Sequence, residues 1–271
     1  MINRKSKLNP KKHYLQISLN NTLEEAHQII TNLPLSDRIL IEAGTPLIKR
    51  YGEEGIRQIK QWYTEHLWGQ IIEPSIKPFH HSQPLISLLL DSAKNHQSSS
   101  KKTISSSSLL SKINPYVVAD LKMMDRGETE VNIAARAGAD AVIAIGHSPI
   151  ESLNAFIQKC EDLNLDSMID MMNVSYPLSI LRQLKKLPQV VILHRGVDEE
   201  KFNKEKQIPL YEIRRIKSNY DILVSVAGGD TIKDVEHAIF NDADIVIVWK
   251  SFFQNSSETS NLAQNFLKEI K

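Results

Sequence analysis

Eight short apolar runs, each followed by a longer amphipathic stretch, recur along the chain from residue 13 onward. The runs are rich in β-branched residues and apolar along their length, which is typical of parallel strands buried on both faces. Alternating strands and helices form an open doubly wound sheet or a closed barrel, and a count of eight favours the (β/α)8 TIM barrel. The expected strands are residues 14–19, 38–43, 116–121, 141–145, 167–171, 190–194, 222–226 and 245–249.

The 271 residues fit one barrel over 13–271, interrupted before its third strand. Residues 64–114 include the run SSSKKTISSSS, a composition that buries too little apolar surface to offset the entropy of ordering. We therefore expect a flexible insertion there, with a short helix at 85–94 and solvated histidines, His80, His81 and His96. Residues 1–12 carry five positive charges and no apolar stretch follows them, so we expect a flexible basic arm and not a signal peptide.

The nearly equal numbers of basic and acidic residues argue against partners that attract a protein by its overall charge. With 33 basic and 32 acidic residues the net charge is +1, which gives no global electrostatic attraction to nucleic acid or to an anionic membrane. The longest apolar runs are far shorter than the roughly 18 residues that span a bilayer. The single cysteine, Cys160, excludes a disulfide framework within the chain and a cysteine-only metal cluster. We expect a cytoplasmic protein with neither membrane nor nucleic acid as its partner.

Polar residues stand at the C-terminal ends of the expected strands, where barrels of this kind build their active sites. Charged groups inside or at the ends of apolar strands are costly unless they are paired or bound to metal. Their recurrence at one face of the barrel therefore indicates a functional site. The candidates at these strand ends are Asn20, Glu42, Asp120, Lys122, Asp125, Asp170, His194, Arg195, Gly228, Gly229 and Lys250.

Carboxylates and a lysine among these residues suggest two chemical roles. Glu42 and Asp120, with Asp170 as a further candidate, are hard oxygen ligands that suit Mg²⁺ together with water and substrate oxygens. Asp120 and Lys122 point to the same face of a strand, so the lysine stays protonated beside a carboxylate. Its ammonium can stabilise an anion or donate a proton.

A pair of glycines, Gly228 and Gly229, precedes a helix expected to begin near Thr231. Bare backbone N–H groups and the positive end of that helix suit a phosphate. A Gly-Gly pair alone is a weak signal, but phosphate commonly binds after the seventh strand of such barrels.

Several segments, taken together, match one enzyme family. They are LQISLNNTLEEA (15–26), IEAGTPLIK (41–49), VVADLKMMDRGETEV (117–131), ARAGADAV (135–142), MIDMMNV (168–174), VVILHRGVDEE (190–200), VAGGDTI (226–232) and ADIVIV (243–248). On these segments the chain resembles the 3-hexulose-6-phosphate synthases of the orotidine-phosphate-decarboxylase superfamily, whose close relatives are the 3-keto-L-gulonate-6-phosphate decarboxylases.

The resemblance implies a (β/α)8 homodimer that uses Mg²⁺ for the reversible aldol addition of formaldehyde to ribulose 5-phosphate. The product is an arabino-3-hexulose 6-phosphate, formed through an enediolate. It implies that Glu42 and Asp120 bind the metal, that Lys122, Asp170 and the proton-transferring His194 are catalytic, and that Asp125 reaches the neighbouring subunit's site. Expected substrate and phosphate contacts are Asn20, Arg195, Gly228, Gly229 and Lys250.

Departures from the family pattern leave some alternatives open, and two positions argue against others. The family usually has Asp where this chain has Asn20, and Gly-Gly or Gly-Arg where it has Trp249 and Lys250. Val197 replaces an arginine of some relatives, which argues against keto-gulonate decarboxylation, and Glu42 replaces the usual lysine of orotidine-phosphate decarboxylases. Three alternatives remain. The chain is a decarboxylase or aldolase of the superfamily that acts on another sugar phosphate, a non-catalytic barrel with a vestigial site, or a protein that binds RNA through the insertion.

Overall fold

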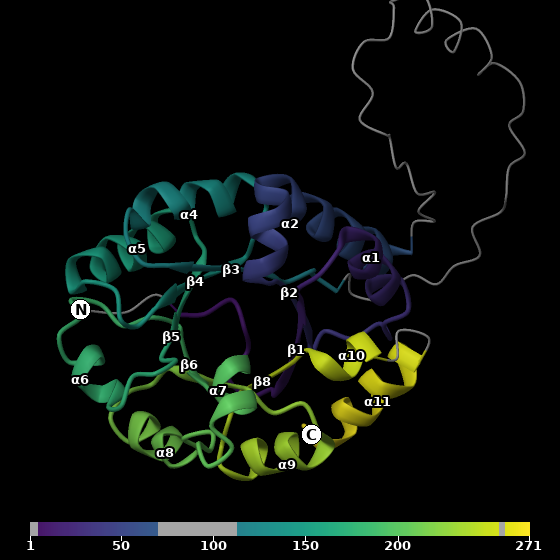
Figure 1. Ribbon diagram of the computed structural model, residues 1–271. Helices are drawn as coiled ribbons and strands as arrows, with labels where there is room; N and C mark the ends of the chain where they lie inside the picture. The colour runs from purple at the N-terminus through teal and green to yellow at the C-terminus, as the bar shows by residue number, and fades with distance from the viewer. Residues whose placement is uncertain (1–4, 70–112, 255–257) are drawn as a thin grey trace, which may run out of the picture.

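Eight parallel strands close into a barrel in the computed structural model, which describes residues 5–69, 113–254 and 258–271 (Figure 1). Each strand pairs with the next along the chain, and β8 pairs with β1, so the sheet has no free edge. The predicted (β/α)8 TIM barrel is confirmed. The strands are β1 (Tyr14–Leu19), β2 (Ile39–Ala43), β3 (Val117–Met123), β4 (Ala141–Ile145), β5 (Asp166–Asp170), β6 (Val190–His194), β7 (Leu223–Ala227) and β8 (Ile245–Val248).

Strands β1, β4 and β6 have the bounds that the sequence predicts, and the other strands differ by one or two residues at one or both ends. The largest difference is in β3, which continues to Met123 where the sequence predicts an end at Leu121. Its register with β4 shifts between Ala119 and Met123. The polar residues of this stretch therefore belong to an irregular strand and not to a loop.

The helices form a ring outside the barrel (Figure 1). Polar caps begin two of them: Thr22 Oγ1 accepts a hydrogen bond from the N–H of Glu25 before α1, and Thr231 exchanges bonds with Asp234 before α9. The long helices are α1 (Leu23–Thr31), α2 (Thr45–Trp68), α4 (Gly127–Arg136), α5 (Ile150–Asp162), α9 (Ile232–Phe240) and α11 (Thr259–Glu269), and α6 (Pro177–Leu181) and α8 (Tyr211–Lys217) are shorter.

Two short helices, α7 (Val197–Phe202) and α10 (Lys250–Gln254), directly follow β6 and β8, and the sequence did not predict them. None of the residues of α7 is buried, so the helix has no apolar periodicity that a sequence pattern could reveal. In Figure 1, α7 lies inside the ring of outer helices. Helix α7 therefore belongs to the carboxyl end of the barrel, whereas α10 packs on α11 through the buried Phe252.

The apolar core has two parts, because successive strand residues face opposite sides of the sheet. Leu15, Ile17 and Leu19 pack in the larger cluster between the strands and the helices. A smaller cluster, with Tyr14 and Met168 among its members, fills the barrel interior. Toward the carboxyl ends of the strands the inward positions become polar, which produces the site described below.

The N-terminal segment packs at the end of the barrel where the strands begin. Leu8 is buried with the interior cluster. Ser6 Oγ donates a hydrogen bond to Asp166 Oδ2 at 2.7 Å, and Lys7 Nζ lies 3.2 Å from Asp140 Oδ1. Where the sequence predicts a flexible arm over residues 1–12, the described part of that segment is therefore attached to the barrel, through one apolar side chain and two acidic acceptors.

The ends of the insertion lie side by side. Helix α2 continues to Trp68, beyond the expected start of the insertion at residue 64, and Gly69 ends it with a φ of +67°. The indole Nε1 of Trp68 donates to the carbonyl of Ile113 at 3.2 Å. Residues 70–112, which include the predicted helix at 85–94 and the three histidines, lie outside the described residues.

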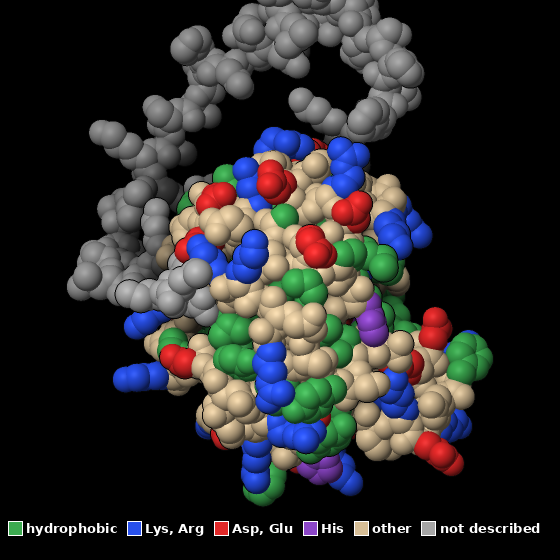
Figure 2. All heavy atoms as spheres, turned by 90° about the vertical axis from the view of Figure 1, so that its left-hand side faces the viewer, with side chains coloured by type: hydrophobic (Ala, Val, Ile, Leu, Met, Phe, Trp, Pro, Cys, Tyr) green, Lys and Arg blue, Asp and Glu red, His purple; other side chains and the backbone are tan. Residues whose placement is uncertain are grey.

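The outer surface carries both signs of charge. On the side that bears α5 and α6, Figure 2 shows basic and acidic side chains with apolar ones between them. Within the described ranges, no helix combines the length and the apolar character that crossing a bilayer requires.

Candidate active site

A pocket of about 400 Å³ opens at the carboxyl ends of the strands. This is the end where the sequence predicts the site, and side chains from most of the strands and the loops after them reach it. The structure brings together in its lining Asn20, Glu42, Asp120, Lys122, Asp170, His194, Arg195, Gly228 and Lys250.

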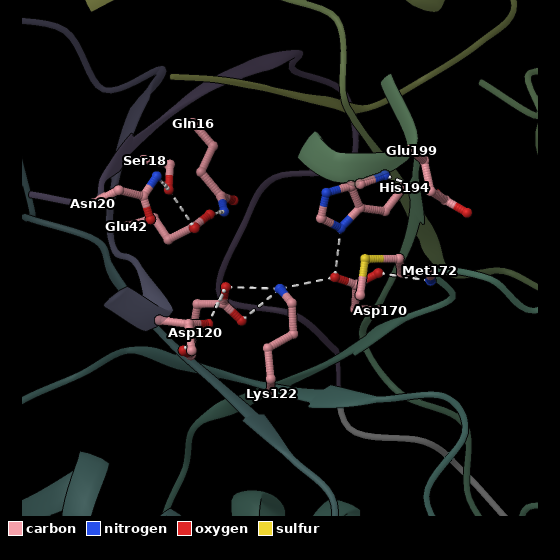
Figure 3. Close-up of polar contacts among 12 residues, drawn as sticks. Gln16, Ser18, Asn20, Glu42, Asp120, Lys122, Asp170, Met172, His194 and Glu199 are labelled. Carbon is pink, nitrogen blue, oxygen red and sulfur yellow. Dashed lines mark hydrogen bonds and ion pairs between the residues drawn. The ribbon is translucent and has the colours of Figure 1, made fainter. Parts of the chain in front are cut away.

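A continuous line of charged groups crosses the pocket (Figure 3). Lys122 Nζ lies 2.9 Å and 2.7 Å from the two carboxylate oxygens of Asp120 and 2.9 Å from Asp170 Oδ2. The same oxygen of Asp170 lies 2.8 Å from His194 Nδ1. Residues from β3, β5 and β6 thus form one acid–base array, in which each charge faces an opposite or ionisable neighbour.

The pKa values in this array move in opposite directions. Burial by itself raises the pKa of Asp170, but His194 and Lys122 lower it more strongly, so this carboxyl stays ionised. Burial lowers the pKa of His194, and Asp170 raises it by more. Burial also lowers the pKa of Lys122, but the surrounding carboxylates, led by Asp120, raise it above its ordinary value. Because Asp170 remains ionised, Nδ1 of His194 carries the shared hydrogen and Nε2 is the free ring nitrogen.

The backbone at Lys122 is in the left-handed region, with φ +47°. This conformation is uncommon for a residue with a side chain, and it coincides with the register shift in β3. Thr45 Oγ1 donates to both the carbonyl and Oδ2 of Asp120 at 2.9 Å. The irregular strand therefore directs the Lys122 ammonium back toward the carboxylate two residues earlier, and helix α2 fixes that carboxylate from its first residue.

On the neighbouring strand β2, beside Asp120, Glu42 is buried among neutral donors. Ser18 Oγ donates to its Oε1 at 2.6 Å, Gln16 Nε2 donates to its Oε2, and Asn20 Nδ2 donates to Ser18 Oγ at 3.1 Å. Burial raises the pKa of Glu42, and the Asp120 carboxylate raises it further. Figure 3 shows this group facing the charged array.

The donor set fits a hard divalent cation. Within the described ranges, Glu42 forms no ion pair, although it is 5% exposed and close enough to Asp120 for the two charges to repel each other. A cation between two buried carboxylates relieves that repulsion, and two carboxylates with water and substrate oxygens suit Mg²⁺. No cluster of three or more His, Cys, Asp or Glu side chains able to hold a metal occurs among the described residues. Glu42 and Asp120 are therefore the two carboxylates that would hold such a cation, with water and substrate completing its ligands.

The end of the pocket near β7 and β8 carries the predicted anion contacts. Gly228 has φ +99°, and a Cβ there would lie 2.3 Å from the carbonyl oxygen of Arg195, so only glycine fits. Arg195 Nη2 donates to the Gly228 carbonyl at 2.6 Å. Lys250 Nζ contacts Glu200 of α7.

Two predicted site residues lie elsewhere. Asp125 is exposed beyond β3 and accepts a hydrogen bond from Ser152 Oγ at 3.3 Å, outside the pocket of its own chain. Gly229 is not in the pocket lining, and a Cβ at this position would lie 2.6 Å from Cβ of Asp234. Gly229 therefore allows the turn to pack closely on α9.

Sequence reasoning missed four polar groups of the site. Gln16 and Ser18 alternate along β1 with apolar residues, and this alternation leading to Asn20 is a signal that could have placed them inside the barrel. Thr45 and Glu200 gave no comparable signal, because each acts through a residue far away in the sequence: Thr45 through Asp120 and Glu200 through Lys250.

The closed barrel and the buried array of acids, lysine and histidine define a (β/α)8-barrel protein with an acid–base site at the carboxyl ends of its strands. Residues 96–262 match the family described as "Orotidine 5'-phosphate decarboxylase / HUMPS family", and the chain belongs to this family.

Curated relatives share the whole barrel. The chain is 32% identical over 263 residues to the "Bifunctional enzyme Fae/Hps" of Methanosphaera stadtmanae, and 30% identical over 262 residues to the protein of the same name from Methanocella arvoryzae. These matches cover 95% of this chain but 52% and 53% of the relatives. The chain thus spans about half the length of the curated relatives that it matches.

Solved structures share the fold. The 3-hexulose-6-phosphate synthase of Salmonella typhimurium superposes with a TM-score of 0.69 at 21% identity, covering 95% of this chain and 98% of that one. The 3-keto-L-gulonate-6-phosphate decarboxylase of Vibrio cholerae gives a TM-score of 0.62 at 18% identity, covering 96% of this chain and all of that one (100%). At these identities the similarity is one of architecture.

Proposed function

We propose that the chain is a carbon–carbon lyase that catalyses the reversible, Mg²⁺-dependent aldol addition of formaldehyde to ribulose 5-phosphate, giving 3-hexulose 6-phosphate. The observation that carries this proposal is the array formed by Asp120, Lys122, Asp170 and His194, with Glu42 beside Asp120. Two names among the comparisons support this proposal: the curated relatives are called Fae/Hps, and a solved neighbour is a 3-hexulose-6-phosphate synthase.

The array supplies a base for the first step. His194 Nε2 removes a proton from C1 of the keto sugar, while the ionised Asp170 holds Nδ1–H and stabilises the imidazolium that forms. The resulting enediolate attacks the carbon of formaldehyde, one carbon–carbon bond forms, and the former aldehyde oxygen takes up a proton. In the reverse direction the same groups release formaldehyde.

The developing negative charge faces a fixed cation. The Lys122 ammonium is held by Asp120 and Asp170, so it needs no reorientation as charge develops on the substrate oxygens. Glu42 and Asp120 are the residues that would hold Mg²⁺, and this ion would supply further positive charge beside those oxygens. Asn20, two residues beyond Ser18, offers an amide for a substrate hydroxyl.

The phosphate binds at the end of the pocket formed by Gly228, Arg195 and Lys250 in this proposal. This end adjoins β7 and β8, whereas Lys122 and Asp120 stand on β3 across the barrel. A group bound there supplies binding energy without taking part in the chemistry.

We also propose a cytoplasmic homodimer. Asp125 is exposed outside the pocket of its own chain, as expected for a side chain that completes the site of a second copy. Sedimentation velocity should give the mass of a dimer. Dilution to the monomer should lower the specific activity, and a monomer with full activity would contradict a shared site.

The test is formaldehyde consumption with ribulose 5-phosphate and Mg²⁺, with an EDTA control, together with formaldehyde release from hexulose 6-phosphate. Metal-dependent turnover in either direction is expected. A folded protein that binds Mg²⁺ without turnover would favour a decarboxylase or aldolase of the same family acting on another sugar phosphate. A protein with neither turnover nor Mg²⁺ binding would be a barrel with a vestigial site.

A further inference from the structure

The cations at the phosphate end of the pocket are engaged by the chain's own groups. Lys250 Nζ forms an ion pair with Glu200 Oε2, and the other oxygen of Glu200 lies 3.9 Å from Arg195 Nη2. Both cations are partly buried, with side-chain exposures of 31% and 16%. A carboxylate of α7 thus occupies the position between two cations that an incoming anion would be expected to take.

The main-chain donors of the same end are engaged as well. Asp230 Oδ1 accepts hydrogen bonds from the backbone N–H groups of Trp249 at 2.6 Å and Lys250 at 3.0 Å. Two carboxylates therefore balance the two cations, and this end of the pocket has no net positive charge for a phosphate.

Donor capacity nevertheless remains. Nε of Arg195 and Nε1 of Trp249 are buried without a hydrogen-bond partner among the described residues, and both side chains line the pocket. Buried N–H groups are usually paired, so within the described part of the chain these two are donors without an acceptor, although neither nitrogen is itself exposed to the pocket. This end thus combines two cations with two donors that lack acceptors, while two acidic groups offset the positive charge.

The two carboxylates differ in how firmly they are held. Asp230 follows the glycine turn of β7, and two backbone bonds fix it. Glu200 is 35% exposed and stands on α7, which has no buried residue. A helix with few buried apolar contacts opens at low cost. Glu200 is therefore the carboxylate that can be displaced.

We propose that Glu200 is an internal competitor for the phosphate subsite: the phosphate of the substrate replaces it at Lys250, so Glu200 sets the affinity of the pocket for phosphate monoesters. The identity of the ligand rests on the proposed function, but the competition itself does not depend on aldol chemistry. Removal of the Glu200 charge should tighten phosphate binding, whereas a residue that only positions Lys250 should, when removed, weaken it.

The experiment is calorimetric titration of the intact 271-residue chain with inorganic phosphate at constant ionic strength. Glu200→Gln should bind phosphate about three- to tenfold more tightly than wild type, the range expected for a partly exposed ion pair. The matched control is Asp198→Asn, which removes the same charge from an exposed position of α7 and should leave the affinity unchanged. Lys250→Met should weaken binding, and Glu200→Gln should give a smaller gain in that background, because only Arg195 is then left for the carboxylate to occupy.

Equal or weaker phosphate binding by Glu200→Gln would overturn the proposal. A gain of undiminished size without Lys250 would also overturn it, because that gain would not come from competition at Lys250. If wild type binds no phosphate, the proposal requires binding to appear in Glu200→Gln. The KM for ribulose 5-phosphate should fall in parallel. Tighter phosphate binding without turnover would contradict the aldol reaction alone, and turnover with unchanged phosphate affinity would contradict the competition alone.

Discussion

Nδ1 of His194 lies 2.8 Å from Oδ2 of Asp170, although the two residues are 24 positions apart and end neighbouring strands. The parallel register of β5 and β6 brings both side chains to the same end of the barrel. Because Asp170 also faces Lys122, it remains ionised and fixes the imidazole in one tautomer. The acid–base behaviour of the pocket therefore depends on this contact.

Replacement of Asp170 by Asn should lower kcat for the aldol reaction by about 10²–10³-fold, within the range for general acid–base catalysis. The base form of His194 is the reactive one, so the wild-type rate should rise with pH through a pKa above the ordinary histidine value. In Asp170→Asn that rise should move to lower pH. Asp166→Asn, at the opposite end of β5, is the control that should leave the pH profile unmoved. An unchanged profile in Asp170→Asn would contradict the role of the pair.

The same contact predicts a pH window for stability. The pKa of Asp170 is lowered by folding, so its contribution is present above about pH 3.9, the unfolded value, and is lost as pH falls through the folded pKa. The pKa of His194 is raised, so its contribution is full below about pH 6.5 and is lost as pH rises through the folded pKa. Urea unfolding should show the largest destabilisation by His194→Gln near pH 5 and a smaller one at pH 9. A difference independent of pH would mean that only packing was lost.

Substitution of the two proposed metal ligands, Glu42 and Asp120, should affect turnover and stability differently. Glu42→Gln and Asp120→Asn should each abolish Mg²⁺-dependent turnover, measured as formaldehyde consumption. Since the pKa of Glu42 is raised by burial, its ionised form costs stability at neutral pH, and Glu42→Gln should unfold at an equal or higher urea concentration without Mg²⁺. The exposed Glu236→Gln on α9 serves as the control. Full activity in either variant would contradict the proposal that Glu42 and Asp120 bind Mg²⁺.

The contact between Trp68 and Ile113 predicts that the insertion can be shortened. Its two described ends are hydrogen-bonded at 3.2 Å, so a linker of about six residues, with a reach of about 20 Å, can replace residues 70–112. A shorter loop has a smaller closure entropy, so Tm should stay the same or rise by a few degrees. Scanning calorimetry of the shortened chain measures this. An aggregated product would mean that the insertion contributes to folding.

The barrel could be predicted from the sequence because its signals are local. Each apolar run and each helix cap acts within a few residues, and the polar strand ends followed from the rule that a barrel gathers its carboxyl ends at one face. What the sequence could not give is the pairing across that face. Nothing near Lys250 indicates Glu200, and nothing in the DLK segment indicates the left-handed φ of Lys122.

Two smaller elements were missed for related physical reasons. Helix α7 has no buried face, so it lacks the apolar period that identifies a helix. The attachment of the N-terminal segment depends on Leu8 entering the barrel and on Asp166 accepting from Ser6, a contact 160 residues apart. A basic composition alone does not reveal such a contact.

That attachment has a practical consequence for fusions to this protein. The segment from Lys5 onward packs where the strands begin, whereas the pocket opens where they end. A domain or affinity tag joined ahead of it starts from the face opposite the pocket, with the full length of the barrel between the two. Substrate access should be insensitive to what is joined at that end, so N-terminal fusions are the natural format for immobilising the protein or linking it to a second enzyme.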